Sequence, residues 1–496
     1  MEYCHENISE KQAVNMENKK ILSNFIWRFA ERCSAQMVTF IVSIVLARLL
    51  DPDTYGTIAL MTVFISIAQI FVDSGLGNSL IQKKDSDDID FSTVFYVNIL
   101  FCCGLYVMIY VTAPVIASFY HNMEMVPMVR VLGLTLIISG LKNVQQAYVA
   151  RNMMFKCFFF STLGGTICAA IVGITMAYMR CGVWALIVQN VINVTIDTVI
   201  LWITVQWRPQ AQFSIKRLRK LYSFGWKLLV SAILDTGYNN LWSLIIGRVY
   251  TPADLGLYNQ GDKFPKLIVS NVNTSIDSVL LPAMSNVQDE REHVKSMTRR
   301  SIMTSVYIMA PLMIGMVSMA EPLVRLVLTD KWLPCVPYLR IFCITYLFWP
   351  IHTANLNAIN AMGRSDLFLK LEIIKKIVGV MSLLITVKHG VMGMAYSQLL
   401  IGLICQVINA WPNSKLLNYR YIDQLKDIMP GIALAALMGG IIYPMCYLHL
   451  ADSFILIIQL IFGIAIYLGF SMLFKNESFF YIWRIISQII DRKKSI

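Results

Sequence analysis

The sequence predicts an all-α integral membrane protein of about 14 transmembrane helices, arranged as two six-helix lobes in parallel repeat plus two extra C-terminal helices. Three observations support this prediction. The composition is too apolar for a water-facing surface, stretches of membrane-spanning length follow one another along the chain, and one motif recurs near residues 48 and 248.

The composition indicates that most of the chain faces lipid. Of 496 residues, 57% are hydrophobic and 15% are charged, and the mean hydropathy is +0.60. Soluble domains carry about 25% charged residues. Lipid offers the backbone no hydrogen-bond partners, so only helices or closed barrels can span it. A barrel would show short alternating segments, and none is visible, so we expect helices.

Fourteen apolar stretches are each long enough to cross a hydrocarbon core of ~30 Å at ~1.5 Å per residue. The first twenty residues are polar and lack the pattern of a removable signal peptide, so we expect the first span to act as the insertion signal. The spans begin near residues 22, 54, 91, 126, 157, 183, 222, 255, 301, 336, 367, 391, 427 and 453.

The distribution of basic residues predicts the orientation. Alternate connections on the side of both termini hold roughly 29 Lys and Arg, and the opposite side holds roughly 8. The positive-inside rule therefore predicts that both termini lie in the cytoplasm. Basic runs such as 216–220 are expected to face anionic lipid headgroups and not nucleic acid.

A repeated motif relates the two halves of the chain. The stretches "LARLLDPDTYGTIAL" and "IGRVYTPADLGLYNQ" both place Pro four residues and Gly eight residues after an Arg. Six spans separate the copies, an even number, so both copies enter the membrane in the same direction. The matched residues are Trp27-Arg28 with Trp226-Lys227, and Arg48, Pro52 and Gly56 with Arg248, Pro252 and Gly256.

The motif has a local interpretation. Proline ends one helix and begins the next, and glycine is expected to permit a tight turn. Arg48 and Arg248 are each expected to end a span at the external interface, where the C-terminal helix dipole favours a cation. Each is either an interfacial anchor or an element of coupling or gating.

The repeat also predicts the domain organisation. Two lobes of six spans are followed by a pair of spans outside the repeat. The predicted segments are a cytoplasmic N-terminal segment (1–21), an N-terminal lobe (22–207), a basic cytoplasmic linker (208–221), a C-terminal lobe (222–412), spans 13 and 14 (413–474) and a basic cytoplasmic tail (475–496).

Four stretches carry a resemblance to a known family. They are "LARLLDPDTYGTIAL", "LGLYNQGDKFPKLI", "LLPAMSNVQDE" and "NLNAINAMGRSDLFLKLEIIKK", in this order along spans 1 to 12. The chain resembles the polysaccharide transport (lipopolysaccharide/O-antigen oligosaccharide-lipid flippase) family of the MOP exporter superfamily.

The resemblance implies a function. It implies a bacterial inner-membrane protein with two six-helix lobes around a central cavity. Such a protein moves undecaprenyl-diphosphate-linked oligosaccharide to the external leaflet by alternating access, for surface polysaccharide biosynthesis. Spans 13 and 14 resemble the extra pair that lines a groove for the lipid tail in the related lipid II flippase. Possible further partners are H⁺ or Na⁺ and the polysaccharide polymerase machinery.

Charges inside spans are costly and therefore indicate function. Arg28, Glu31 and Arg32 share one face of span 1 at i, i+3 and i+4. Arginine suits diphosphate oxygens, and Glu31 would reduce the buried net charge. The alternative is an internal ion pair that holds span 1 to a neighbour. The resemblance favours a role in transport, because the lipid II flippase has essential arginines and an acidic residue in its first span.

The second lobe offers further candidates. Lys227 is the repeat partner of Arg28, and Asp235 on the same face either pairs with a cation or couples transport to an ion. Lys263 and Asn271 in span 8, and His352 and Asn355 in span 10, are candidate substrate-binding residues or helix-packing groups. Further carboxylates near span interiors, with weaker claims to ion coupling, are Asp73, Asp197 and Asp277.

No cofactor, metal or disulfide is expected, because the eleven cysteines are scattered and form no CxxC pattern. Two other functions remain open. One is a cation-coupled drug or metabolite antiporter of the same superfamily, which would need an acidic or apolar cavity to bind cationic drugs. A membrane glycosyltransferase would want external acidic residues, which Asp51 and Asp53 formally supply. No nucleophile–base pair or phosphate-binding glycine loop is visible, so an enzyme is not predicted.

Overall fold

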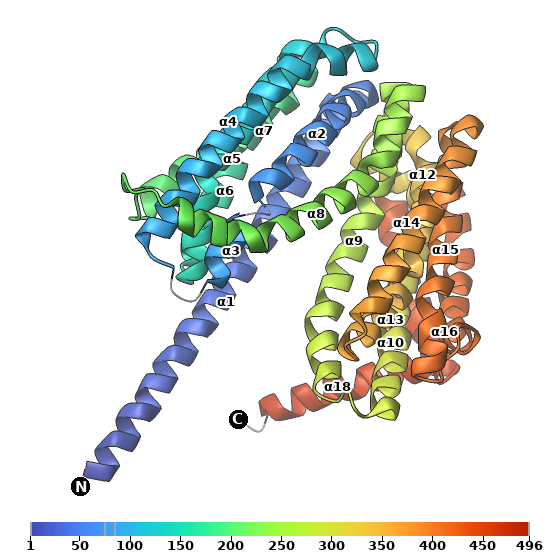
Figure 1. Ribbon diagram of the computed structural model, residues 1–496. Coiled ribbons are helices and arrows are strands. Elements are labelled where there is room, and N and C mark those ends of the chain that lie inside the picture. Colours follow the sequence, from blue (N-terminus) through green and yellow to red (C-terminus); the bar gives the residue numbers. More distant parts are fainter. Residues whose placement is uncertain (1, 74–75, 84–85, 495–496) are drawn as a thin grey trace. The chain divides into compact units, whose positions relative to one another are not determined.

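The computed structural model describes residues 2–73, 76–83 and 86–494, and these residues form helices and short connections with no β-strand (Figure 1). Some side chains within the helices, including that of Lys227, lie outside the described part. The all-α prediction is confirmed. The chain divides into two compact units, Met1–Ala253 (unit 1) and Asp254–Ile496 (unit 2).

Unit 1 is a helical bundle in which α4 lies beside α5, α5 and α6 lie beside α7, and α1 lies beside α6 (Figure 1). Its helices are α1 (Glu2–Leu49), α2 (Pro52–Asp73), α3 (Leu76–Gln82), α4 (Asp88–Phe119), α5 (Met125–Arg151), α6 (Phe155–Tyr178), α7 (Val183–Thr204) and α8 (Ile215–Val249).

Unit 2 is built around α10, which packs against α12, α13 and α16. Its helices are α9 (Pro252–Ser285), α10 (Arg291–Ser318), α11 (Ala320–Val327), η1 (Asp330–Cys335), α12 (Val336–Leu347), α13 (Trp349–Ala361), α14 (Ser365–Thr386), η2 (Val387–His389), α15 (Gly390–Leu416), α16 (Tyr421–Ile442), η3 (Tyr443–Tyr447), α17 (Asp452–Leu473) and α18 (Glu477–Lys494).

The predicted span starts agree with the helix starts. A helix, or the broken helix η1–α12–α13, begins within about ten residues of thirteen of the fourteen predicted positions, whereas the helix that contains the first predicted start, near residue 22, begins at Glu2. Eleven segments of the described chain are long and apolar enough to cross a membrane, and one of them holds both α14 and α15. Helices α8 and α9 are not among these eleven segments, because their charged and polar side chains lower their mean hydropathy. The protein is thus a multi-pass membrane protein.

Helix α8 packs within unit 1, although the repeat relates it to α1. It lies beside α2, α3 and α4, and the boundary between the units follows two residues into α9. The predicted lobe and linker boundaries, which would assign α8 to the second lobe, stay a prediction.

The two copies of the motif have the same local structure. Helix α1 ends at Leu49 and α2 begins at Pro52, and α8 ends at Val249 and α9 begins at Pro252. Arg48 and Arg248 lie in the last turns of their helices. The backbone N–H groups in the first turn of a helix make no intrahelical hydrogen bond, so proline, which lacks an N–H, is tolerated there. The positions of the two prolines in the sequence therefore predict both helix boundaries.

The interpretation of the motif glycines as turn residues is wrong. Gly56 and Gly256 are both buried and both helical. A Cβ on Gly56 would lie 1.6 Å from the carbonyl oxygen of Pro252. One copy of the motif therefore packs directly against the other, and Gly56 is needed for close backbone approach and not for a turn.

A charged network fixes the segment that leads into α8. Asp90 is fully buried at the start of α4 and pairs with Lys83 and, at 3.5 Å, with Arg217. Asp87 forms a capping box with Asp90 and pairs with Arg217. Arg217 lowers the pKa of Asp87 to about 2 by hydrogen bonding. The basic run 216–220 thus includes a residue that binds carboxylates of the protein itself.

Candidate functional site

The candidate charges of span 1 lie against α6. Arg28 Nη1 is 2.7 Å from Glu31 Oε2, and Thr162 Oγ1 donates to Glu31 Oε1 at 3.5 Å. The Arg28 guanidinium lies 5.1 Å from the ring centroid of Phe158 and 5.7 Å from that of Phe155. The internal ion pair exists, and it places Arg28 level with the first turn of α6, at the end of the bundle predicted to face the cytoplasm.

Arg32 differs from Arg28 although it lies on the same helix face. Its side chain is exposed, and no hydrogen bond or ion pair holds it within the described part of the chain. An unpaired guanidinium in an apolar helix is costly unless water or a ligand solvates it. Arg32 is therefore available to a ligand in this conformation, while Glu31, 9% exposed, is committed to Arg28.

Lys156 adds a cation that the sequence analysis did not select. It lies at the start of α6, 5.8 Å from the ring centroid of Trp27 and 6.0 Å from that of Phe160. Trp27 packs edge-on against Phe159 at 5.2 Å. Lys156, Arg28 and Arg32 together give this edge of unit 1 a positive surface backed by aromatic rings.

Helix α8 carries two of the candidate residues, Lys227 and Asp235. The side chain of Lys227 lies outside the described residues. Asp235 is exposed, and Tyr238 and Trp242 pack edge-to-face at 5.5 Å one and two turns further on. Trp242 is buried, and its indole N–H has no partner in the described structure.

In unit 2, Lys263 and Asn271 lie on α9. Lys263 is half-buried and has no ion-pair partner among the described residues, whereas the neighbouring Lys266 pairs with Asp262 at 3.4 Å. Asn271 is exposed, and its amide donates to the Leu267 carbonyl at 2.8 Å.

A polar surface continues along α9 beyond Asn271. Its exposed hydroxyls donate to backbone carbonyls of the same helix, which satisfies the donors but leaves oxygen acceptors at the surface. Such a polar surface on a helix of a membrane protein requires water or a polar partner. The exposed residues are Ser270, Asn271, Thr274, Ser275, Asp277 and Ser278.

His352 and Asn355 of α13 make separate contacts with amide side chains of α15 and α16. Asn355 is fully buried, donates to Gln424 Oε1 at 2.8 Å, and accepts from Asn413 and Gln424 at 2.7 and 3.1 Å. His352 Nδ1 lies 2.5 Å from Asn409 Nδ2. The Asn355 amide is therefore occupied by protein atoms in this conformation.

The two interfacial arginines have defined surroundings in the structure. Arg248 Nη1 lies 2.6 Å from His121 Nε2, and its guanidinium lies 5.0 Å from the ring centroid of Phe119. His121 follows α4 with a positive φ of 54°. These contacts tie the end of α8 to the end of α4. Arg48, in the corresponding position at the end of α1, is exposed and also interacts with its surroundings.

The other intramembrane carboxylates have partners. Lys142 Nζ lies 2.9 Å from Asp197 Oδ2, with both side chains largely buried. Asn357 donates to Asp277 Oδ1 at 2.7 Å, and Gln69 donates to Asp73 Oδ1 at 2.9 Å. The first two pairs link α5 to α7 and α9 to α13, whereas Gln69 and Asp73 both lie on α2.

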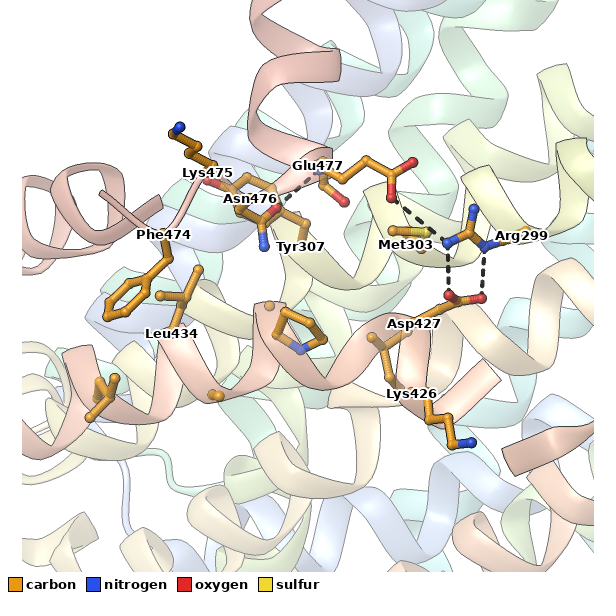
Figure 2. Close-up of a pocket in the computed structure, with 16 residues that line it drawn as sticks. Arg299, Met303, Tyr307, Lys426, Asp427, Leu434, Phe474, Lys475, Asn476 and Glu477 are labelled. Atoms are coloured by element: carbon orange, nitrogen blue, oxygen red, sulfur yellow. Dashed lines mark hydrogen bonds and ion pairs between the residues drawn. The ribbon is translucent and has the colours of Figure 1, made fainter. Parts of the chain in front are cut away.

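Unit 2 contains a pocket that was not predicted from the sequence. A cavity of about 460 Å³ lies between α10, α16 and the junction of α17 with α18 (Figure 2). Arg299 forms two 2.9 Å hydrogen bonds with the carboxylate of Asp427 at its edge. The sequence signal that could have found it is the amphipathic pattern of 477–490, which follows span 14.

Comparison with known proteins identifies relatives along most of the chain. The chain is 25% identical over 383 residues to the teichuronic acid biosynthesis protein TuaB of Bacillus subtilis, covering 76% of this chain and 78% of TuaB. It is 23% identical to the lipopolysaccharide biosynthesis protein WzxC of Escherichia coli, covering 74% of each chain. It is 20% identical to the succinoglycan biosynthesis transport protein ExoT of Rhizobium meliloti, covering 66% of each.

Solved structures share the fold. The lipid II flippase MurJ in an inward closed conformation superposes with a TM-score of 0.72 at 16% identity, covering 91% of this chain and 98% of MurJ. An inward-facing multidrug resistance MATE family transporter of the MOP superfamily superposes with a TM-score of 0.59 at 13% identity, covering 82% and 98%. The chain thus shares the fold of these two solved structures.

The resemblance found in the sequence is confirmed by a family model. The model described as polysaccharide biosynthesis protein matches residues 45–337, which include both copies of the Arg–Pro–Gly motif. This match covers more than half of the 496 residues. The chain therefore belongs to this family of polysaccharide biosynthesis proteins.

Proposed function

We propose that the protein is a flippase that moves polyprenyl-diphosphate-linked oligosaccharide across the bacterial inner membrane for surface polysaccharide biosynthesis. The relatives named for teichuronic acid, lipopolysaccharide and succinoglycan biosynthesis support the pathway. The fold shared with MurJ supports transport. Both termini are proposed to lie in the cytoplasm, on the side with most of the basic connections.

The observation that carries the proposal is an unpaired cation in each unit. Arg32 in α1 and Lys263 in α9 have no carboxylate partner among the described residues. A diphosphate needs cationic donors while it crosses the low-dielectric part of the membrane, because burying an uncompensated anion costs several kcal/mol or more. Unpaired cations can supply this interaction without first breaking an ion pair.

The remaining candidates receive proposed roles around these two cations. Arg28 and Lys227 would add positive charge at the entrance, with Glu31 holding Arg28 in place. Asn271 and the polar surface of α9 would contact the sugar. His352 and Asn355 would support this surface through their separate contacts with amide side chains of α15 and α16. The coupling or gating group would comprise Asp235, Arg48 and Arg248, with H⁺ or Na⁺ as the proposed coupling ion.

The proposed cycle is alternating access. The diphosphate would bind unpaired cations from the cytoplasmic side, and the polyprenyl tail would stay in lipid. A conformational change would then open the site to the external side. The polysaccharide polymerase machinery would consume the product.

The proposal is tested with the purified protein in proteoliposomes that contain a fluorescent polyprenyl-diphosphate-linked oligosaccharide. Protein-dependent exposure of the glycan to a membrane-impermeant lectin or quencher is expected. Vesicles that contain a polyprenyl-linked sugar without the diphosphate serve as the control and should show little movement. Equal movement of both lipids, or of neither, would refute the proposal.

An antiporter for cationic drugs is the second candidate, because a MATE transporter shares the fold. Such a transporter would gain little from unpaired Arg32 and Lys263, since like charges repel its substrate. A glycosyltransferase is less favoured, because Asp53 lies in the first turn of α2, where a carboxylate stabilises the helix N-terminus. Drug efflux without glycan movement in the same vesicles would favour the antiporter.

A further inference from the structure

Unit 2 carries a two-part pocket that the proposed transport mechanism does not use. The cavity of about 460 Å³ adjoins a second one of about 290 Å³. The two share Arg299, Met303, Glu477 and Ser478 in their walls. They lie between α10, α16 and the start of α18, and α16 to α18 fall outside the predicted repeat.

The larger part of the pocket is mainly apolar. Tyr307 of α10, Leu434 of α16 and Phe474 line it, as Figure 2 shows. Leu437 and Phe474 are 50% and 63% exposed, so the apolar wall reaches the surface of the helix bundle. An apolar recess that opens on the surface of a membrane protein can take a hydrocarbon chain.

The smaller part is polar and positive. Arg300 and Arg484 line it from α10 and α18, together with the hydroxyls of Ser296 and Thr304. The Arg300 guanidinium lies 4.6 Å from the ring centroid of Tyr481. Neither arginine has a carboxylate partner within the described chain, whereas Arg299 between the two parts is held by Asp427 at 2.9 Å and lies 3.7 Å from Glu477.

Helix α18 has the pattern of a helix that lies in the membrane surface. Asn476 caps it by accepting from the backbone N–H groups of Ser478 and Phe479 at 3.0 and 3.3 Å. Figure 1 shows α18 running at a large angle to α10. Phe480 and Trp483 are 44% and 58% exposed, and aromatic side chains favour the headgroup level. The positive groove therefore lies where α18 would meet lipid headgroups.

We propose that this two-part pocket binds an anionic glycerophospholipid of the surrounding leaflet. Its phosphodiester lies between Arg300 and Arg484, and one acyl chain lies against Tyr307, Leu434 and Phe474. Basic pockets between membrane helices on the cytoplasmic side bind anionic headgroups, and that leaflet is rich in them. A soluble phosphate would leave the apolar part of the pocket empty. The headgroup of a zwitterionic lipid would place a further positive charge near Arg300 and Arg484.

The test is the thermal unfolding of the purified full-length protein in neutral detergent with added phosphatidylglycerol or phosphatidylcholine. A ligand that binds the folded state raises the unfolding midpoint. We expect a larger rise with phosphatidylglycerol, and we expect this excess to fall by at least about half in Arg300→Gln/Arg484→Gln. The matched control Lys216→Gln/Arg219→Gln removes two exposed cations on the same predicted membrane side and should keep the full excess.

A second variant keeps the test decisive if the double variant does not fold. Ala433 lines the apolar part and is exposed, so Ala433→Phe fills the recess without removing a contact and should also reduce the excess. Equal rises with the two lipids would overturn the proposal. So would an undiminished excess in both pocket variants, or an equal rise with soluble glycerol phosphate.

Discussion

Gly56 lies so close to Pro252 that a Cβ on the glycine would come within 1.6 Å of the proline carbonyl oxygen. These residues belong to the two copies of the repeated motif, one at the start of α2 and one at the start of α9. A second close approach follows nearby, because a Cβ on Gly247 of α8 would meet Leu60 of α2 at 1.9 Å. The junctions of the two repeats are thus packed together through glycine.

We therefore predict that Gly56→Ala destabilises the protein. The methyl group would meet backbone atoms that cannot rotate away, and overpacking of this kind costs about 1–3 kcal/mol. The measurement is the thermal unfolding midpoint in detergent, which should fall. Gly104→Ala is the matched control, because Gly104 is helical and exposed and a Cβ added there would meet nothing within 4 Å. The control should be neutral or stabilising, and an equal effect of both changes would argue against the close contact.

Glu31→Gln tests whether the pair with Arg28 is mainly structural. The change leaves Arg28, 38% exposed on its side chain, over two phenyl rings without a carboxylate. Because water partly screens the arginine, we expect a loss of roughly 1 kcal/mol in stability. Thr162→Val removes only the weaker 3.5 Å hydrogen bond and should cost less. A transport defect in Glu31→Gln without any loss of stability would instead assign Glu31 to the substrate path.

Asp90→Asn is expected to be one of the most damaging single changes outside the candidate site. Asp90 is fully buried and pairs with Lys83 and Arg217, so its neutralisation leaves Lys83 without its anion, while Arg217 keeps its pair with Asp87. Breaking a buried pair costs about 3–5 kcal/mol. The protein should unfold at a markedly lower temperature or fail to accumulate in the membrane. Asp366→Asn, which removes a pair between exposed residues, should have little effect.

The pH dependence of the Asp87 pair has a defined sign. Arg217 lowers the pKa of Asp87 from its ordinary value near 3.8 to about 2, so the folded state favours the charged carboxylate. The stabilisation is present above about pH 4 and is lost as the pH falls towards 2. The midpoint difference between the wild type and Asp87→Asn should shrink over this range. A difference that grows with falling pH would contradict the assigned pair.

The sequence predicted the helices better than it predicted their contacts. Apolar length sets the spans, and proline sets the boundaries at Pro52 and Pro252, since both effects are local. Helical spacing predicts that Arg28 and Glu31 lie within reach of each other, and the structure pairs them. The role of Gly56 was missed because its partner lies in the other copy of the motif. The burial of Asp90 was missed because a polar connection shows no sign of its tertiary partners.

The candidate site was only partly predictable for the same reason. Spacing placed Arg28, Glu31 and Arg32 on one face, but only the packing of α6 separates the paired Arg28 from the unpaired Arg32. His352 and Asn355 are polar residues in an apolar helix, a pattern shared by cavity-lining and helix-packing groups. Their amide partners on α15 and α16 show the packing contacts, which the sequence alone could not assign.

The most direct test of the transport account is the translocation rate of a diphosphate-linked glycan by the Arg32→Gln/Lys263→Gln variant in proteoliposomes. Loss of two charge-assisted contacts, each worth about 1.5–3 kcal/mol, should slow movement by roughly a hundredfold or more. The control Arg180→Gln/Lys388→Gln removes two exposed cations from connections and should keep the wild-type rate. A wild-type rate in the Arg32 and Lys263 variant, with the protein folded, would contradict the claim that unpaired cations in the two units carry the diphosphate.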